Sequence, residues 1–330
     1  MIPIRQKEVV YMISITDIHQ ARERTSHITH VTPIFESEQL SNICGNRMLL
    51  KSEHLQKTGS FKIRGASNKV IHAAENGADY ITTASSGNHG QAVAYITNTY
   101  HIPSTIVVPE DSSQCKVDAI RSYKGKIETC GTTSEERLAR AQEIAQETNG
   151  IYVPPYDDPF VMAGQGVVGL ELLEQIDDID VVVVPIGGGG LISGILTAIK
   201  QTKPSIQVIG VEPEQAKDTY LSLQNKQITS SSASTIADGL RTSQPGNLTF
   251  PVLMKYIDDI VLVSEEEIRL AFTFVMERMK QLIEPSSATT IAAAMFNKLP
   301  VQQKNVVPII SGGNVDVERL DHYILKTTEV

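Results

Sequence analysis

The chain has 330 residues, of which 41% are hydrophobic and 20% are charged, and this composition excludes a disordered protein and predicts one large or two smaller globular domains. The net charge of −9 disfavours nucleic acid and anionic membranes as partners, because both would repel the average surface. Cys44, Cys115 and Cys130 lack metal-ligand or CxxC spacing, which indicates a reducing compartment. The first residues carry no apolar signal-peptide region, so we expect a cytoplasmic protein.

Short Val- and Ile-rich runs alternate along the chain with stretches of helical periodicity. We expect strands at residues 47–51, 80–84, 105–108, 126–129, 181–186, 207–211, 260–263 and 306–310. We expect helices at residues 18–25, 62–77, 90–97, 134–148, 162–175, 191–200, 265–280 and 287–298. This alternation predicts open, doubly wound α/β sheets. Residues 179–199 are apolar enough for a membrane span, but the four glycines among them favour a buried strand, a loop and a helix.

Lys62 is the main candidate for a catalytic residue. It follows Phe61 at the predicted start of a helix, where partial desolvation would lower the pKa of its amine and free it to form a Schiff base. Three further polar or glycine-rich segments each follow a predicted strand, at the edge of a parallel sheet where ligands bind. These segments are Ser85–Gly90, Gly187–Leu191 and Ser311–Asn314.

The glycine run predicts a phosphate site, because it lets backbone N–H groups approach an anion at the start of a helix. It comprises Gly187, Gly188, Gly189 and Gly190, and Leu191 follows. A dinucleotide fingerprint is the rival interpretation, supported by Glu212 at the end of the next strand. Its register fails, because Ile192 or Ser193 falls where the third glycine is needed.

The four segments, in this order and at these separations, resemble the fold-type II pyridoxal-phosphate enzymes, in the branch that contains serine racemases and serine/threonine dehydratases. The resemblance covers nearly the whole chain and implies two open doubly wound domains like those of the tryptophan synthase β-subunit. A large domain of residues 1–74 and 153–330 would bind the cofactor, and a small domain of residues 75–152 would close the active-site cleft. The resemblance also implies a homodimer.

The resemblance assigns cofactor roles to residues of all four segments. Lys62 would hold pyridoxal 5′-phosphate, and Phe61 would pack against its ring. Asn88 would reach the ring hydroxyl, and Ser311 would share a hydrogen bond with the ring nitrogen. A neutral hydroxyl does not hold that nitrogen protonated, which favours elimination and racemisation over transamination. Taken alone, Ser311 is better interpreted as a structural residue of an ordinary turn.

Substrate contacts are expected from the segment after the second predicted strand. By resemblance, Ser85 binds the substrate carboxylate with help from Arg137, and His89 is a positioned polar group. Ser86 matches the second acid/base of serine racemases and also occurs in some hydroxyaspartate dehydratases. A helix N-cap by Ser85 or Ser86, and a solvated Arg137, remain the structural alternatives.

Glu212, Ala216 and Asp218 resemble the divalent cation site of the family. Two carboxylates and a backbone carbonyl are hard oxygen ligands that suit Mg²⁺, Ca²⁺ or Mn²⁺. Without the resemblance, both carboxylates would be interpreted as solvated surface groups. We expect a structural and activating role for the cation.

These features predict an ammonia-lyase that converts L-threonine or L-serine to a 2-oxo acid and ammonia by α-proton abstraction and β-elimination. Ser86 permits serine racemase activity or a threo-3-hydroxyaspartate dehydratase. Tyr156, before Asp157 and Asp158, matches the threonine dehydratase pattern, whereas mammalian-type serine racemases carry asparagine there. A pyridoxal-phosphate-binding regulatory protein is the non-enzymatic alternative, although a binder would not need the amine of Lys62.

Overall fold

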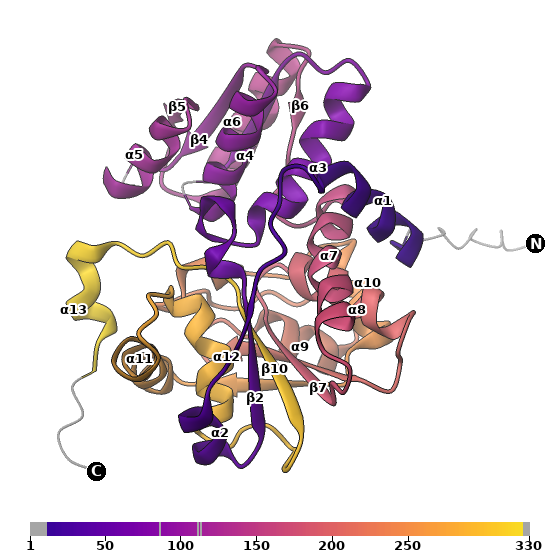
Figure 1. Cartoon of the computed structure of the whole chain (residues 1–330). Helices are drawn as coiled ribbons and strands as arrows, with labels where there is room; N and C mark the ends of the chain where they lie inside the picture. The colour runs from indigo at the N-terminus through magenta and orange to yellow at the C-terminus, as the bar shows by residue number, and fades with distance from the viewer. Residues whose placement is uncertain (1–11, 86, 111, 113, 326–330) are drawn as a thin grey trace, which may run out of the picture.

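The chain folds around two sheets, one of six strands and one of four, which lie one above the other in Figure 1. This computed structural model describes residues 12–85, 87–110, 112 and 114–325. The smaller sheet is built from residues 81–152, and the larger one from residues on both sides of that segment. Both sheets are mainly parallel, which confirms the predicted α/β class. The exact bounds of the two predicted domains stay a prediction.

The larger sheet is parallel except for its first strand, which pairs antiparallel with the second. Its strands, in spatial order, are β1 (Ile34–Glu36), β2 (Arg47–Ser52), β10 (Asn305–Ile310), β7 (Val181–Pro185), β8 (Gln207–Pro213) and β9 (Asp259–Val263). The central strand β7 is buried along its whole length. A strand covered on both faces has no polar side to alternate with, which explains its unbroken valine run.

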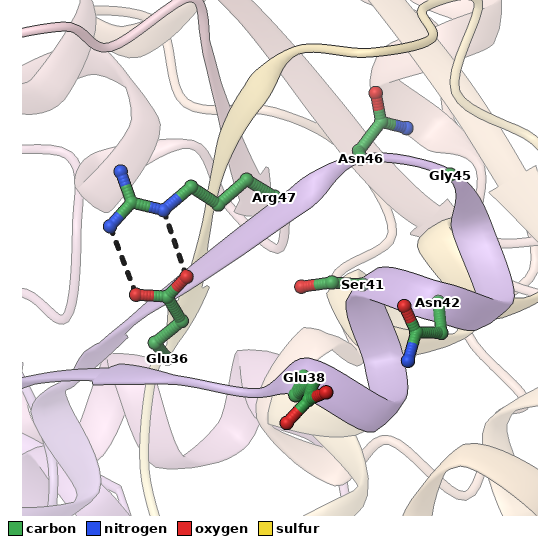
Figure 2. Close-up of a pocket in the computed structure, with 7 residues that line it drawn as sticks. All are labelled: Glu36, Glu38, Ser41, Asn42, Gly45, Asn46 and Arg47. Atoms are coloured by element: carbon green, nitrogen blue, oxygen red, sulfur yellow. Dashed lines mark hydrogen bonds and ion pairs between the residues drawn. The ribbon is translucent and has the colours of Figure 1, made fainter.

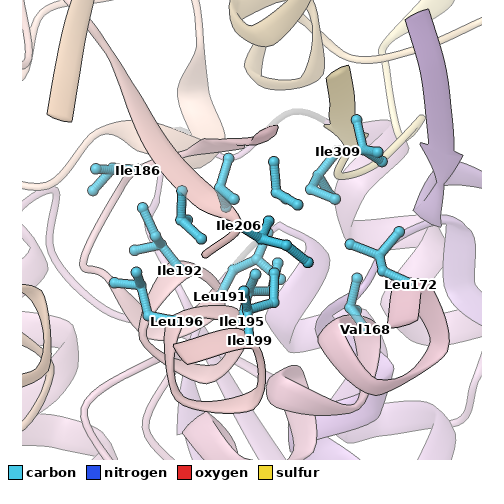
Figure 3. Packing of buried hydrophobic residues seen from close by; sticks show 14 of the residues in the cluster. Val168, Leu172, Ile186, Leu191, Ile192, Ile195, Leu196, Ile199, Ile206 and Ile309 are labelled. Atoms are coloured by element: carbon cyan, nitrogen blue, oxygen red, sulfur yellow. The ribbon is translucent and has the colours of Figure 1, made fainter. Parts of the chain in front are cut away.

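Helices cover both faces of this sheet. On one face, Val182 and Val184 join a hydrophobic cluster with side chains of α7 (Pro159–Gln175), α8 (Gly190–Lys200) and α10 (Thr249–Tyr256). Figure 3 shows the isoleucines and leucines of α8 packed there. On the other face, Val181 and Val183 join a second hydrophobic cluster with side chains of α2 (Glu38–Cys44), α11 (Glu265–Phe274) and α12 (Pro285–Met295).

The smaller sheet has its own core. Its strands, in spatial order, are β5 (Lys126–Thr129), β4 (Ser104–Val108), β3 (Ile81–Ala84) and β6 (Ile151–Tyr152). Helices α3 (Lys62–Glu75), α4 (Asn88–Thr99) and α5 (Gln114–Ser122) pack with one face, and α6 (Ser134–Glu147) packs with the other. Two further helices, α9 (Asp218–Asn225) and α13 (Leu320–Tyr323), lie outside this core, and α1 (Ile15–Thr25) packs on α7.

The predicted elements are found, with a few differences. The helix expected at 265–280 ends as α-helix at Phe274 and continues as a π-helix over Val275–Met279. Strands β1 and β6, which have three and two residues, were not predicted, because such short strands give no periodic signal. Helices α2, α5, α9, α10 and α13 were not predicted either.

Four buried charges fix the start of α3. Arg64 bonds Glu53 on one side, at 2.7 and 2.8 Å, and Glu171 of α7 on the other, at 2.6 and 2.9 Å. Lys51 at the end of β2 also donates to Glu171 and to the carbonyl of Thr32. The four charges sum to zero, and each is hydrogen-bonded, as buried ions must be. This network, Lys51–Glu53–Arg64–Glu171, ties α3 to α7 and to the end of β2.

Removing one member should therefore leave an uncompensated charge in the interior. We expect Arg64→Gln to lower the free energy of unfolding by about 3–5 kcal/mol, measured by urea denaturation. Arg47 is the matched control, because it forms the same two-bond pair with Glu36 at the surface (Figure 2), at 2.8 and 3.0 Å.

The side chains of Arg47 and Glu36 are 51% and 49% exposed, so Arg47→Gln should lower the free energy of unfolding far less than Arg64→Gln does. Equal losses in the two variants would contradict the special role of the buried network.

Candidate active site

Lys62 lies between the segments that follow β10 and β6. The chain before it pairs with the segment after β10, through a bridge between Ser60 and Gly312 and a 3.0 Å bond from the N–H of Phe61 to the carbonyl of Ser311. The amine of Lys62 donates to the carbonyl of Pro155 at 2.7 Å and lies 5.2 Å from the centre of the Phe61 ring. Burial lowers the pKa of Lys62 from 10.5 to about 8, against the opposing effect of Glu284. The amine is thus partly neutral near pH 8, as a nucleophile or base requires.

Glu284 is a buried carboxylate that the sequence pattern did not predict as part of the site. The side-chain nitrogen of Asn88 donates to its carboxylate and lies 3.0 and 2.9 Å from the two oxygens, and the side-chain carbonyl of Asn88 accepts from Asn314 at 2.8 Å. Burial and the nearby Asp238 raise the pKa of Glu284 to about 7. The residue precedes Pro285 and is the one charged residue in the sequence between Lys280 and Lys298, which was the available signal.

A second charged contact joins the two sheets. Lys116 of α5 bonds Asp238, which begins a 3-10 helix, Asp238–Leu240. The N–H of Gly239 donates to Ser286 at 3.0 Å, beside Glu284. The sequence did not indicate Lys116 or Asp238, because no local sequence pattern predicts a contact between residues so far apart in the chain.

The glycine run forms a cradle without room for side chains. A Cβ on Gly188 would lie 2.4 Å from the ring of Tyr156, and one on Gly189, whose φ is +91°, would lie 2.8 Å from the Thr249 hydroxyl. Gly190 begins α8, and the first turn of a helix has N–H groups without intrahelical acceptors. These groups and the helix dipole suit a phosphate.

Ser311 lies at the other strand end, next to this loop. It is 2% exposed and follows β10, which pairs with β7. Its hydroxyl lies 3.1 Å from that of Ser287. Direct contacts or a shared neighbour therefore link Lys62, Asn88, the glycine run and Ser311. These residues come from the four segments that were expected to form one site.

The predicted substrate residues have different surroundings. Ser85 accepts from the N–H of Gly87 at 3.3 Å, and Ser86 lies outside the described residues. His89 is buried, and its Nε2 lies 3.0 Å from the carbonyl of Val153. Burial and the charge of Lys62 lower the pKa of His89 to about 3, so the ring is neutral and is not a proton carrier near pH 7. Arg137 donates to Thr132 and Ser134 at the start of α6, and its role toward a substrate stays a prediction.

Glu212 and Asp218 are buried together at the end of β8 and the start of α9. Glu212 accepts from the N–H groups of Thr219 and Tyr220, at 3.0 and 2.8 Å. Burial raises the pKa of Glu212 to about 8, with a further contribution from Asp218, and burial raises that of Asp218 to about 7. One oxygen of Asp218 is buried without a hydrogen-bond partner. Within the described part of the chain no cluster of three or more acidic, His or Cys side chains is placed to hold a metal, so a cation here would rely on two carboxylates, the carbonyl of Ala216 and water.

A buried amine beside a backbone cradle for phosphate and a hydroxyl at the neighbouring strand end defines a site for an aldehyde cofactor that carries a phosphate. The chain matches the family described as pyridoxal-phosphate dependent enzyme over residues 25–312. It belongs to that family, and the residues present fit the cofactor.

Relatives of two kinds are similar to this chain over nearly its whole length. The L-threonine ammonia-lyase of Thermotoga maritima is 41% identical over 96% of this chain and 79% of its own. The serine racemase of Dictyostelium discoideum is 40% identical over 95% of this chain and 98% of its own. The solved threonine deaminase isoform 2 of Solanum lycopersicum is 32% identical, with a TM-score of 0.88, over 98% of this chain and 92% of its own. No described helix is both long and apolar enough to cross a membrane.

The lowered pKa of Lys62 leads to a prediction for the protein before cofactor is added. Only a neutral amine attacks an aldehyde, so the rate of attachment of pyridoxal phosphate should rise with pH around a midpoint near 8, rather than near 10.5. Glu284→Gln should move the midpoint lower, because the carboxylate that favours the charged amine is gone. Stopped-flow absorbance measures the rate, and Lys255→Gln, at the surface, is the control. A midpoint that stays above 10 would contradict the described environment of Lys62.

The cation site gives a separate prediction. A cation that binds between Glu212 and Asp218 stabilises the folded state, so Mg²⁺ should raise the melting temperature of chelator-treated protein. Glu212→Gln should abolish this rise, whereas Glu214→Gln, at an exposed position, should keep it. Identical melting curves with and without Mg²⁺, Ca²⁺ or Mn²⁺ would show that the two carboxylates do not bind a cation.

Proposed function

We propose that this protein is an ammonia-lyase that converts L-threonine or L-serine to the 2-oxo acid and ammonia. The observation that carries the proposal is the amine of Lys62, whose pKa is lowered to about 8 beside a glycine cradle for phosphate. The ammonia-lyase and deaminase named among the similar proteins support it.

Bound pyridoxal phosphate supplies an electron sink that makes the α-proton of an amino acid acidic. Lys62 would hold it covalently, with Phe61 against the ring, and the N–H groups of Gly187–Leu191 would bind the phosphate. When it is not bound to the cofactor, the neutral amine of Lys62 would be the base that removes the α-proton. Asn88, fixed by Glu284 and Asn314, would hold the ring hydroxyl, and Ser85 would orient the substrate carboxylate.

Tyr156 favours elimination over racemisation as the main reaction. Its ring lies against Gly188 and its backbone against Gly190, at the position where the dehydratase pattern has an aromatic residue. Burial, with contributions from Asp157 and Asp218, raises the pKa of its hydroxyl, so the ring is neutral. The phenol therefore keeps its proton, and it is the match to the dehydratase pattern that favours elimination.

Serine racemase activity is the second candidate, because the chain is as similar to serine racemases as to ammonia-lyases. Racemisation needs a proton donor on each face of the α-carbon, and Ser86 would be the donor opposite Lys62. A threo-3-hydroxyaspartate dehydratase uses the same groups. We further propose a cytoplasmic homodimer for any of these activities.

The two reactions are separated by incubating the holoenzyme with L-serine, L-threonine and threo-3-hydroxyaspartate and measuring oxo acid, ammonia and D-amino acid together. Ser86→Ala should lower any racemisation by about 10²–10⁴-fold, because it removes one of two acid/base groups, while ammonia release continues. Ser122→Ala, at the surface, is the control. If the Ser86 variant interconverts L- and D-serine as fast as the parent, Ser86 is not the second acid/base; if no substrate yields oxo acid, the lyase proposal is wrong.

A further inference from the structure

Thr249 is a buried residue beside the glycine run, and it lies outside the four segments that form the candidate site. It is the first residue of α10 and is 0% exposed. Its Oγ1 lies 2.8 Å from the carbonyl oxygen of Gly188 and 3.2 Å from that of Gly246. A threonine hydroxyl has one proton, and the shorter distance assigns that proton to Gly188. Thr249 therefore donates to a carbonyl inside the glycine run.

A second donor from the same segment holds this carbonyl. The N–H of Gly246 donates to the carbonyl of Gly188 at 3.2 Å, and a backbone carbonyl has two lone pairs for two such donors. Asp157 fixes the segment that supplies them, because its carboxylate accepts the N–H groups of Asn247 and Leu248 at 2.9 and 2.8 Å. The carbonyl of Gly188 therefore points toward the start of α10.

The direction of this carbonyl determines where the next N–H points. The peptide between Gly188 and Gly189 is trans, and the C=O and N–H bonds of a trans peptide point in opposite directions. The N–H of Gly189 therefore points away from α10. Gly189 is buried, yet its N–H has no hydrogen-bond acceptor within the part of the chain that the structure describes. A buried donor without a partner is rare in proteins, and a ligand can supply the missing acceptor.

A peptide between two glycines needs such an anchor. Neither residue has a Cβ to restrict its backbone, and the φ of Gly189 is +91°. A side chain cannot provide the restriction, because a Cβ on Gly189 would lie 2.8 Å from the Thr249 hydroxyl. A hydroxyl bonded to the carbonyl of Gly188 limits rotation of the peptide and leaves the other side of the loop open.

We propose that Thr249 is a positioning residue that holds the N–H of Gly189 toward the cofactor phosphate. The proposal rests on the proposed function, in which the N–H groups of Gly187–Leu191 bind that phosphate. Thr249 acts through the peptide of Gly188 and Gly189. Its hydroxyl therefore strengthens binding of the phosphate group and has no effect on the bond between Lys62 and the aldehyde.

A comparison of pyridoxal phosphate with pyridoxal tests this role, because pyridoxal has the same ring and aldehyde but no phosphate. The dissociation constants of both are measured on the full-length protein, stripped of cofactor, by the absorbance of the Schiff base. Thr249→Val replaces the hydroxyl with a methyl group of similar size, and it should weaken binding of pyridoxal phosphate by about 3–10-fold. The affinity for pyridoxal should remain that of the parent. Thr249→Ser, which keeps the hydroxyl, should bind both compounds as the parent does.

Thr197→Val is the structural control. The Thr197 hydroxyl is also buried, and it donates to the carbonyl of Ser193 at 2.9 Å within α8. Its loss removes a buried hydrogen bond next to the site but none from the glycine run, so the ratio of the two dissociation constants should not change. If Thr249→Val melts below the temperature of the measurement, Thr249→Ala takes its place and should show the same selective loss.

Four results would overturn the proposal: unchanged binding of pyridoxal phosphate by the valine and alanine variants of Thr249, an equal loss for pyridoxal, the same loss in Thr249→Ser, or the same selective loss in Thr197→Val. Failure of the proposed function looks different. A parent that binds pyridoxal phosphate no more tightly than pyridoxal would show that the glycine run does not bind phosphate, and this would also overturn the role of Thr249. A parent that binds the phosphate selectively but forms no oxo acid would contradict the lyase alone.

Discussion

The structure depends on the buried salt-bridge network around Arg64. Lys62 and Arg64 are two residues apart in the first turn of α3, so their side chains leave the helix on different sides. Arg64 points into the protein and is fixed by Glu53 and Glu171, which sets the position from which Lys62 presents its amine. An arginine suits this role because its planar fork bonds two carboxylates at once and stays charged when buried. The buried ion pairs of Arg64 therefore help to determine where Lys62 places its amine.

The contacts around Lys62 come from elements that are distant in sequence. Strand ends of the larger sheet supply the glycine loop and Ser311, while α4 of the smaller sheet supplies Asn88. Asn88–Glu284 and Lys116–Asp238 then join the two sheets beside the amine. Burial without full pairing keeps the amine of Lys62 near neutrality and raises the pKa of Glu284, and these are the conditions that proton transfer requires.

The sequence predicted the α/β class, the valine-rich central strand and the four segments that meet at Lys62, because buried parallel strands and glycine turns leave local signals. It did not predict Glu284, Asp238 or Ser287. Their contacts are tertiary and leave no local signal. Glu284 contacts Asn88, and Ser287 contacts Gly312 and Ser311, which are distant from them in the sequence. Short elements such as β6 were missed for a related reason, since strand pairing rather than local pattern defines them.

The assignment of Lys62 as the amine that would hold pyridoxal phosphate can be tested by reducing the holoenzyme with borohydride, because reduction makes the attachment permanent. Digestion and mass spectrometry then identify the modified lysine. We expect one modified peptide, which contains Lys62, and loss of that modification in Lys62→Ala. A cofactor fixed to a different lysine, or a parent protein that carries no modification after incubation with pyridoxal phosphate, would contradict it.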